Sequence, residues 1–429
     1  MKVLALTAIE APFRSRLIET QFFDPLAEAM GSSQQKWQLS VLSVIPAAFY
    51  LSRRNPFKQY NLSRNRNMAL RSDLAKKDII YRTSLTLYPL FPKQFNLRKN
   101  ETVLFIVRVL PRLILKLLFI KPDLIIARSY PATLLAYWTK KILKIPYIFD
   151  LRGMYPEEAV NAGRYGINST DYLFWKDWEK KLISSAKYCV VVSQPFVEHV
   201  LSIDPSARVE FIPCCVDPAK IKPQEKGNIK VKYGLSGRFV LLHLGSFGTP
   251  GDRGLVGRYL LRFKKIRPDV VLVIASGTPA YGPAIEKALT DEGLKADDFR
   301  IYHPSGSELS DMMALGDAGL ILERKAANTK VCLSVKLGEY LAAGIPVICS
   351  PHVEGVVRLM EEYRFGMAVD PDKDEPLAKE AAFLRDYESL KKNGYRLVQE
   401  MLSLEKCSDR WGNIIGRALK AEGREKDVQ

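Results

Sequence analysis

Short runs of almost uniformly apolar residues alternate along the chain with longer segments in which apolar residues recur every three or four positions. The runs in the first half read KVLALT, WQLSVLSVI, PDLIIARS, IPYIFDLRG, YCVVVS and RVEFIP; those in the second half read RFVLLHLGS, VVLVIAS, FRIYHP, AGLILER, IPVICS and FGMAVDP. A strand without polar alternation is buried on both faces, as in a parallel sheet covered by helices. The segment GLVGRYLLRFKK predicts one covering helix, whose apolar stripe is Leu255, Val256, Tyr259, Leu260 and Phe263.

Two strings of such strand–helix units predict an α/β protein with two doubly wound, Rossmann-like parallel-sheet domains. Between the strings, the segment PCCVDPAKIKPQEKGNIKVKYGLSG is rich in Pro, Lys and Gly and lacks periodicity. We therefore expect an N-terminal domain at 1–212, a linker at 213–235 and a C-terminal domain at 236–407. A last helix at about 408–425 has no strand after it, so it can pack back on the first domain.

Composition narrows the class of protein. The chain has 429 residues and 47% hydrophobic content, enough for two cores. The start, MKVLALTAIEAPFRSR, has too short an apolar run for a signal peptide, so we expect none. The six cysteines lack the spacing of metal ligands, which favours reduced thiols in a cytoplasmic protein.

The positive charge is concentrated in the first part of the chain. The net charge is +17, and residues 1–150 hold 24 Lys/Arg against 9 Asp/Glu, a net charge of +15. A one-sided field of this size predicts an anionic partner for the first domain. A membrane surface, a phosphorylated substrate and nucleic acid are the three classes to consider.

One basic segment favours the membrane among these partners. Residues 102–120 (TVLFIVRVLPRLILKLLFI) are almost purely apolar, but a proline and three cations argue against a membrane-spanning helix. Arg108, Arg112 and Lys116 recur at four-residue intervals and predict a cationic stripe that contacts an anionic membrane surface. The alternative is a Rossmann helix with a solvated basic edge. Nucleic acid is not expected, because no stacking or helix-turn-helix motif is visible.

Ligands of open α/β sheets bind beyond the carboxyl ends of the strands, so loops after strands are the places to search. The loop at 245–254 (GSFGTPGDRG) has four glycines between a strand and a helix, and its backbone N–H groups could hold a phosphate. Arg253 in this loop favours that function, since a guanidinium suits a phosphate. The alternative is a plain glycine-rich turn.

A second candidate lies at 333–350, LSVKLGEYLAAGIPVICS. It predicts a short helix, a glycine stop and a buried strand. Lys336 and Glu339 fall in the first turn of the helix, just after Ser334, where backbone N–H groups are free. A surface ion pair one turn apart is the alternative interpretation.

The piece KLGEYLAAGIPVI resembles the donor-site motif of family 4 retaining glycosyltransferases, which have the GT-B fold, two Rossmann-like domains facing a cleft. FDLRGMYPEEAVNAGRYG, FIPCCVD, LHLGSFGTPG and, near the start, SRLIETQ resemble further segments of that family. These pieces occur in the expected order between about residues 3 and 370. The resemblance therefore extends over most of the chain.

The resemblance implies that a nucleotide-sugar diphosphate lies at the start of the KLGEYL helix, with Lys336 near the pyrophosphate and Glu339 on the ribose hydroxyls. The further donor-binding candidates are Gly245, Ser246, Arg253, His303 and Ser334. The chain departs from the family at Val331, where many members have a second glutamate, eight positions before the one matched by Glu339. This departure leaves a non-catalytic binding protein open as an alternative.

For the first domain, the resemblance places the segment after FD on the acceptor side. Its catalytic candidates are Asp150, Arg152 and Glu158, of which a carboxylate could orient an acceptor hydroxyl or take its proton. Simple pairing of the first two across a turn is the alternative. The family usually has a glycine-rich loop in the first βα turn, but this chain has APFRSRLIE. The acceptor-side candidates there are Ser15, Arg16 and Glu19.

The resemblance implies a retaining glycosyltransferase that moves a glycosyl group, such as a hexosyl group, from a nucleotide diphosphate sugar to a hydroxyl of a lipid-linked or polysaccharide acceptor. Because no acidic metal-binding cluster is visible, we expect it to be metal-independent. No cofactor is expected besides this co-substrate. The expected setting is cell-surface glycan synthesis, such as that of lipopolysaccharide, by a cytoplasmic protein peripheral to the inner face of the membrane. The alternatives are an inactive nucleotide-sugar-binding or scaffold protein and a sugar-nucleotide epimerase or hydrolase of the same fold.

Overall fold

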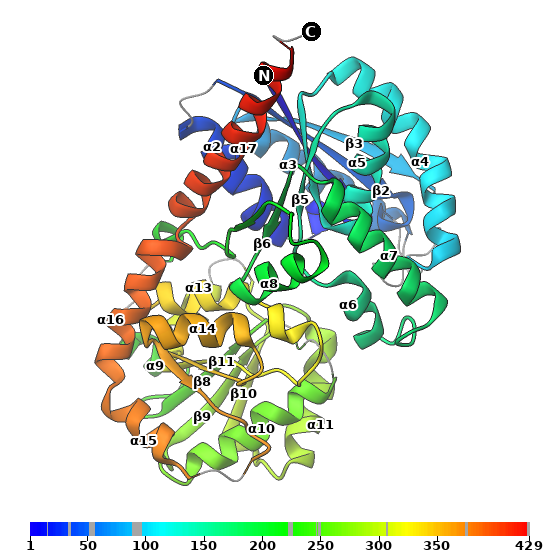
Figure 1. Cartoon of the computed structure of the whole chain (residues 1–429). Coiled ribbons are helices and arrows are strands. Elements are labelled where there is room, and N and C mark those ends of the chain that lie inside the picture. Colours follow the sequence, from blue (N-terminus) through cyan, green and yellow to red (C-terminus); the bar gives the residue numbers. More distant parts are fainter. Residues whose placement is uncertain are drawn as a thin grey trace. The chain divides into compact units, whose positions relative to one another are not determined.

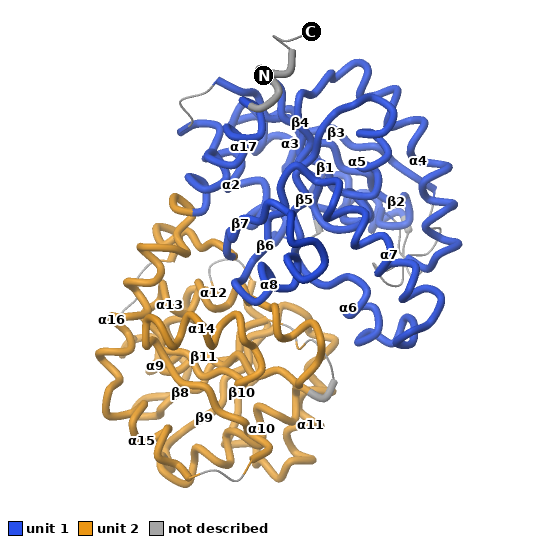
Figure 2. The backbone as a smooth tube through the Cα atoms, viewed as in Figure 1, with its two compact units in different colours: residues 1–213, 407–429 blue, residues 214–406 orange. Residues whose placement is uncertain are grey.

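The computed structural model forms two parallel α/β units, which confirms the predicted fold class (Figures 1 and 2). Unit 1 comprises residues 1–213 and 407–429, and unit 2 comprises residues 214–406. The structure describes residues 1–14, 16–32, 36–50, 56–87, 97–221, 226–245, 247, 250–305, 308–373 and 376–426.

The sheet of unit 1 has seven parallel strands in the order β3-β2-β1-β4-β5-β6-β7. Their bounds are β1 Lys2–Ala8, β2 Gln38–Pro46, β3 Ile80–Thr86, β4 Leu124–Arg128, β5 Tyr147–Asp150, β6 Tyr188–Val191 and β7 Val209–Phe211. The central strands β1, β4 and β5 are buried except at Lys2, as their almost uniformly apolar sequences predict. The strand order reverses between β1 and β4, so the loops that follow these two strands diverge and leave room for a ligand.

Helices cover both faces of this sheet (Figure 1). They are η1 Pro12–Arg14, α1 Arg16–Ile18, η2 Glu19–Phe23, α2 Asp24–Ser32, η3 Ala47–Tyr50, α3 Pro56–Ala75, α4 Lys99–Ile120, α5 Ser129–Leu143, α6 Tyr155–Asn161, α7 Thr170–Ser185 and α8 Gln194–Ile203. The last helix, α17 (Leu404–Lys426), belongs from residue 407 onward to unit 1. Its Arg410 donates to the carbonyl of Phe211 at 3.0 Å, which ties this helix to β7.

The sheet of unit 2 has six parallel strands in the order β10-β9-β8-β11-β12-β13. Their bounds are β8 Phe239–Leu244, β9 Val270–Ala275, β10 Phe299–Tyr302, β11 Ala318–Ile321, β12 Val347–Cys349 and β13 Gly366–Ala368. Its helices are η4 Pro218–Lys220, α9 Lys226–Lys232, α10 Pro250–Lys264, η5 Pro279–Tyr281, α11 Gly282–Asp291, η6 Ala296–Asp298, α12 Glu308–Leu315, η7 Thr329–Val331, α13 Val335–Ala342, α14 Glu354–Tyr363, α15 Ala378–Arg385, α16 Tyr387–Leu397 and η8 Val398–Leu402. The predicted apolar stripe of α10 is buried in the core against β8 and β9.

Within the described ranges, none of the helices combines the length and the apolar character that crossing a membrane requires.

Candidate functional site

Tyr340 fixes the position of α13 on the sheet of unit 2. Its hydroxyl donates to the carbonyl of Leu242 at 3.0 Å and accepts from the N–H of Leu244 at 2.8 Å, both in β8. Its ring lies over Gly319 of β11, where a Cβ atom would come within 2.5 Å of the ring. The start of α13 is therefore held at the carboxyl end of β8.

We expect Tyr340→Phe to lower the free energy of unfolding by about 1–3 kcal/mol, because the buried N–H of Leu244 loses its acceptor. Urea unfolding of the two proteins measures this difference. Tyr395→Phe is the matched control, since Tyr395 is 49% exposed on α16. Equal stability of the two variants would show that the Tyr340 hydroxyl does not hold α13 in place.

This anchoring brings Lys336 beside Gly245, the residue that follows β8. Gly245 has φ +87°, a conformation that favours glycine, and a Cβ atom there would lie 3.5 Å from Cε of Lys336. The side chain of Ser334, the N-cap of α13, makes no capping hydrogen bond. The first turn of α13 thus keeps free N–H groups next to the Lys336 amine, an arrangement that favours anions.

Three charged side chains gather at this edge, namely those of Lys336, Glu323 and Glu339. Burial, opposed by the charges of Glu323 and Glu339, lowers the pKa of the Lys336 amine. Burial also raises the pKa values of the Glu323 and Glu339 carboxyls, and the charge of Lys336 opposes that rise. Across the described parts of the chain, none of the three side chains forms a hydrogen bond or a salt bridge. The ion pair considered for Lys336 and Glu339 is therefore not formed, and the group has the character of a ligand site.

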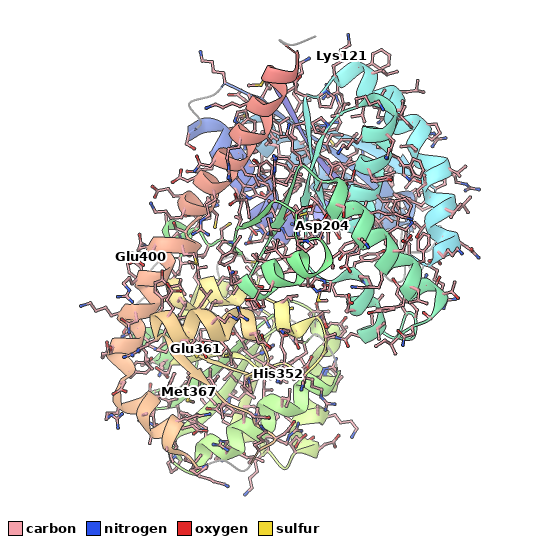
Figure 3. All side chains as sticks on the ribbon, in the orientation of Figure 1. Lys121, Asp204, His352, Glu361, Met367 and Glu400 are labelled. Carbon is pink, nitrogen blue, oxygen red and sulfur yellow. The ribbon has the colours of Figure 1, made fainter. Side chains whose placement is uncertain are left out.

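Glu323, which follows β11, is a site residue that the sequence analysis missed. Its N–H donates to Oγ of Ser350 at 3.0 Å, and Nε2 of His352 lies 2.6 Å from its carbonyl oxygen (Figure 3 labels His352). The next N–H, of Arg324, donates to Asp252 at 3.2 Å. These bonds hold the backbone in place, while the Glu323 carboxyl has no hydrogen-bond or salt-bridge partner among the described residues. Its position near the end of the run AGLILER, just after the strand, was the signal that could have identified it.

Val331 has a structural explanation. It belongs to η7 and is 3% exposed, so this position points into the protein and presents nothing to a ligand. Glu323 brings a carboxyl beside Lys336 from another loop. The site of unit 2 therefore contains two carboxyls although the usual second glutamate is absent.

The remaining donor candidates are Arg253, His303 and Ser246. Arg253 has a buried Nε atom without a hydrogen-bond partner among the described residues, and its guanidinium lies 5.9 Å from the centre of the Tyr281 ring. Nδ1 of His303 lies 2.7 Å from the carbonyl oxygen of Ser276, which gives that ring a structural partner. Ser246 lies outside the described residues.

His243, in β8, is a further residue without a sequence prediction. It is 2% exposed, and neither ring nitrogen has a hydrogen-bond partner among the described residues. Burial and the nearby charge of Lys336 hold the pKa of His243 well below its usual value. The neutral ring stacks on Phe247 with centroids 4.1 Å apart, so it supports the loop after β8.

In unit 1, the backbone is strained where β1 and β4 end. Ile9 has φ 61° and Ser129 has φ 63°. Positive φ is costly for any side chain and most costly for a β-branched one, so such positions often mark functional sites. The strained residues lie next to Glu10 and Arg128, which form a salt bridge of 3.4 Å.

Asp150 ends β5 at the same edge and is completely buried. Its Oδ2 atom accepts from Nε of Arg152 at 2.8 Å and lies 3.6 Å from Arg128. Arg152 also donates to the carbonyl of Gln21 at 2.8 Å. Asp150 and Arg152 therefore do pair, which gives both a role in positioning the loops after β1 and β5.

Glu158, in α6, has the proton affinity expected of an acid–base group. Burial, with the nearby carboxyls of Glu157 and Glu10, raises the pKa of Glu158 to about 7. Its carboxyl folds back onto Gly153, where a Cβ atom would lie 1.8 Å from Oε1. Only glycine at 153 permits this placement. Near neutral pH the carboxyl can therefore hold or accept a proton.

The acceptor-side candidates lie in the first βα connection. Arg16 begins α1 and Glu19 begins η2, and both side chains line a cavity of about 390 Å³ against α3. Ser15 lies outside the described residues.

The predicted cationic stripe of α4 is divided. Arg108 and Arg112 are exposed, whereas the amine of Lys116 donates to the carbonyl of Thr83 in β3 at 3.2 Å. Burial and the charge of Arg82 lower the pKa of Lys116. Lys116 therefore covers the edge of the sheet, and two arginines remain on the outer face.

Comparison with known proteins agrees with this architecture. Residues 69–220, which run from within α3 to the end of η4, match the family model described as Glycosyltransferase Family 4. Among curated proteins, none matches the chain.

Solved structures match over nearly the whole chain. Sucrose-phosphate synthase from Thermosynechococcus elongatus is 15% identical with a TM-score of 0.70, covering 98% of this chain and 100% of that chain. A glycosyltransferase from Rickettsia africae is 16% identical with a TM-score of 0.66, and 98% of each chain is covered. Anabaena HepE in complex with UDP and glucose is 14% identical with a TM-score of 0.63, covering 97% of this chain and 100% of that chain. The resemblance found in the sequence is thus confirmed: residues 69–220 carry the pattern of Glycosyltransferase Family 4, within a chain that has the two-sheet fold of GT-B glycosyltransferases.

Proposed function

We propose that the protein is a retaining glycosyltransferase that transfers a sugar from a nucleotide diphosphate sugar to a hydroxyl of a lipid-linked or polysaccharide acceptor. The observation that carries this proposal is the group of Lys336, Glu339 and Glu323, half-buried at one sheet edge with no hydrogen-bond or salt-bridge partner among the described residues. The complex of Anabaena HepE with UDP and glucose supports a nucleotide sugar as the donor.

Each member of this group suits one part of the donor. Lys336 and the first N–H groups of α13 would bind the diphosphate and stabilise the negative charge that develops as it leaves. Glu339, one turn further into the helix, would accept hydrogen bonds from the ribose hydroxyls. Glu323 would contact sugar hydroxyls and thereby take the part of the carboxyl that is missing at Val331.

We assign the acceptor to unit 1. The Glu158 carboxyl, with its pKa raised to about 7, would hold the proton of the attacking hydroxyl or orient that hydroxyl. The pairing of Asp150 with Arg152 would keep the surrounding loops in place. Transfer through Lys336 and these groups would require no metal ion.

Incubation with a panel of nucleotide sugars tests the proposal. Thermal shift identifies the donor first, since a ligand at 100 times its dissociation constant stabilises a protein by about 2.7 kcal/mol. With that donor we expect slow release of free nucleotide, faster release with an acceptor, retention of the anomeric configuration by NMR, and no loss of activity with a chelator. An inverted product, or activity that dies with chelator and returns with Mn²⁺, would contradict the proposed mechanism.

The same experiment separates the two alternatives. An inactive binding or scaffold protein would show the thermal shift without any release of nucleotide. An epimerase or hydrolase would convert the donor fully without an acceptor. Glu323 disfavours the inactive alternative, because it restores a carboxyl where the absence of a glutamate at Val331 suggested a defective site.

We further propose that unit 1 lies on the inner face of the membrane through the outer side of α4. This helix buries one stripe in the unit, namely Thr102, Phe105, Val109, Leu113 and Leu117. Its other side still exposes large apolar residues, which are Val103, Leu104, Val107, Leu115, Leu118 and Phe119. Arg108 and Arg112 lie among them, and an apolar face with cations suits an anionic lipid interface. Membrane attachment would bring the enzyme to a lipid-linked acceptor.

A further inference from the structure

The cavity beside the first βα connection has a fixed apolar floor. Phe13 and Leu70 are buried there, and the ring of Phe13 lies 4.9 Å from that of Tyr50. Phe13 and Tyr50 belong to a small cluster with Ala11, Ile45 and Phe49, built from the end of β2 and from the segments that follow β1 and β2. The cavity of about 390 Å³ therefore lies near the carboxyl ends of two neighbouring strands, where α/β proteins bind ligands.

Two arginines and two carboxylates line this cavity. They are Arg16, Glu19, Arg66 and Asp73. Asp73 is held by Lys76 at 2.8 Å. Arg16, Glu19 and Arg66 have no side-chain hydrogen bond or salt bridge with any residue that the structure describes. The lining thus keeps two guanidiniums and one carboxylate available.

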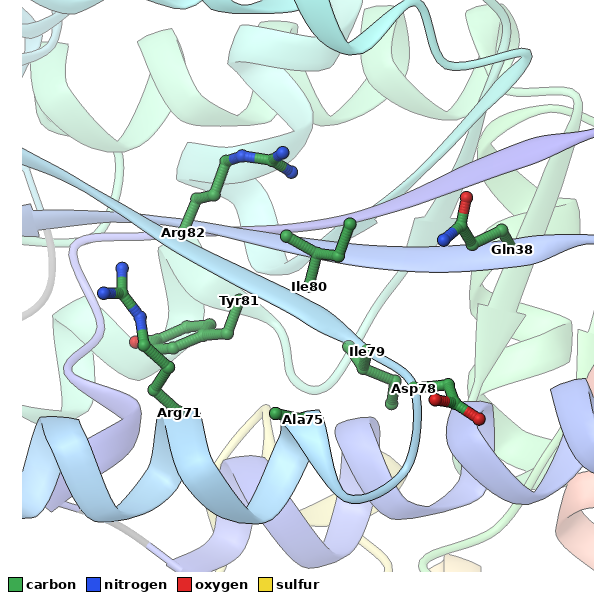
Figure 4. Close-up of a pocket in the computed structure, with 8 residues that line it drawn as sticks. All are labelled: Gln38, Arg71, Ala75, Asp78, Ile79, Ile80, Tyr81 and Arg82. Carbon is green, nitrogen blue, oxygen red and sulfur yellow. The ribbon is translucent and has the colours of Figure 1, made fainter.

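A larger cavity on the same unit lacks this convergence. It has a volume of about 710 Å³ and lies along β3, at the amino-terminal ends of β2 and β3 (Figure 4). Arg71 extends from α3 toward the strand, whereas Arg82 points to the opposite side of it (Figure 4). The two cations do not face one ligand, so the smaller cavity is the better anion site.

We propose that the cavity lined by Arg16, Glu19 and Arg66 binds a sugar or polyol that carries a phosphate. The guanidiniums would bind the phosphate oxygens, the carboxylate would accept hydrogen bonds from hydroxyls, and Phe13 would contact the apolar face of the ring. The volume lies in the range of small-molecule pockets. In calling this ligand the acceptor, the inference rests on the proposed function; the binding itself does not.

Calorimetry with glucose 6-phosphate, glucose and inorganic phosphate tests the site. We expect the sugar phosphate to bind more tightly than either part. Arg16→Gln and Arg66→Gln should each weaken this binding by about tenfold or more, because each removes a charged hydrogen bond. Arg64→Gln is the matched control, since Arg64 is exposed on α3, the helix of Arg66, but does not line the cavity.

Glu19→Gln should change the affinities for the sugar phosphate and for inorganic phosphate in opposite directions. It should weaken binding of the sugar phosphate, because hydroxyls lose a charged acceptor, and it should tighten binding of inorganic phosphate, because a negative charge leaves the cavity. A parallel loss for both ligands would contradict the proposed geometry.

Vesicles distinguish a lipid headgroup from a free sugar phosphate as the source of this chemistry. If the ligand is a headgroup, phosphatidylinositol vesicles should bind more tightly than phosphatidylglycerol vesicles of equal charge, and Arg66→Gln should abolish the difference. If it is soluble, glucose 6-phosphate should bind and the two vesicles should bind alike. Failure of both arms, or binding unchanged in both arginine variants, would overturn the inference. Donor binding by the same variants should stay at the wild-type level, so this failure would leave the proposed function standing.

Discussion

Glu339→Ala is expected to weaken binding of the intact nucleotide sugar by about one to two orders of magnitude, because the ribose hydroxyls lose a charged acceptor worth about 1.5–3 kcal/mol. Calorimetry with the donor and with the free nucleoside measures the effect, and both ligands should lose affinity. Glu361→Ala is the matched control, since Glu361 is an exposed glutamate on α14 (labelled in Figure 3).

Lys336→Ala should affect the diphosphate and the nucleoside of the donor differently. The Lys336 amine lies beside Gly245 and the first turn of α13. Its loss should therefore weaken binding of the nucleoside diphosphate by about tenfold or more and leave binding of the nucleoside unchanged. Lys287→Ala, at a lysine with a 75% exposed side chain on α11, should bind all ligands like the wild type. Wild-type donor affinity in both Glu339→Ala and Lys336→Ala would show that the donor binds elsewhere.

The same two residues are expected to set the pH range of donor binding. In the proposed site the donor binds to the ionised Glu339 carboxyl and the charged Lys336 amine. Because the pKa of Glu339 is raised, its carboxyl becomes protonated at a higher pH than that of an ordinary glutamate. On acidification, donor affinity should therefore begin to fall at that higher pH. Because the pKa of Lys336 is lowered, affinity should also fall at an alkaline pH at which an ordinary lysine is still charged. The bound donor is itself negatively charged and favours the charged form of the Lys336 amine. It should therefore raise the pKa of that amine and make the loss of affinity at high pH smaller.

The parts of this architecture that depend on local pattern could be predicted from the sequence. Uniform apolar runs identified the parallel strands, and the apolar stripe of α10 was found in the core as expected. The helix that begins after Ser334 was also predicted, because its free N–H groups and its first-turn charges are local features.

The parts that depend on distant contacts could not be predicted in this way. Glu323 lies 13 positions before Lys336 in the sequence and joins it only because β8, β11 and β12 are neighbours in the sheet. The hydroxyl of Tyr340 reaches the backbone of Leu242 and Leu244, almost a hundred residues away, so no pattern around Tyr340 indicated this role.

The stripe on α4 shows a limit of the four-residue rule. At about 3.6 residues per turn, each step of four advances about 40° around the helix. Lys116 is therefore turned by about 80° from Arg108. This rotation directs it toward the carbonyl of Thr83, where the open edge of β3 offers an acceptor. Of the three cations of the stripe, Arg108 and Arg112 are the ones that would take part in the proposed membrane attachment.

The reversal Arg108→Glu with Arg112→Glu is accordingly expected to lower binding to anionic vesicles by at least about 30-fold, since each arginine near an anionic surface contributes about 1 kcal/mol and each glutamate adds repulsion. Sedimentation with vesicles at low and high salt measures the effect. The matched control reverses Lys265 and Lys392, two exposed lysines of unit 2, and changes the net charge equally. Donor binding should be intact in both double variants.

The apolar residues of α4 should contribute a part that salt does not remove. Phe119 is 87% exposed, and inserting it into lipid removes that apolar surface from water. At high salt the charges of the arginines are screened, so the apolar contact makes up more of the binding. The fold-loss of vesicle affinity caused by Phe119→Asp should therefore be larger at high salt than at low salt. If the wild-type protein ignores anionic vesicles even at low salt, the net charge of +15 on residues 1–150 must serve a soluble anion instead. The cavity of Arg16 and Arg66 would then be the place to look for it, because it needs no membrane to bind a phosphate.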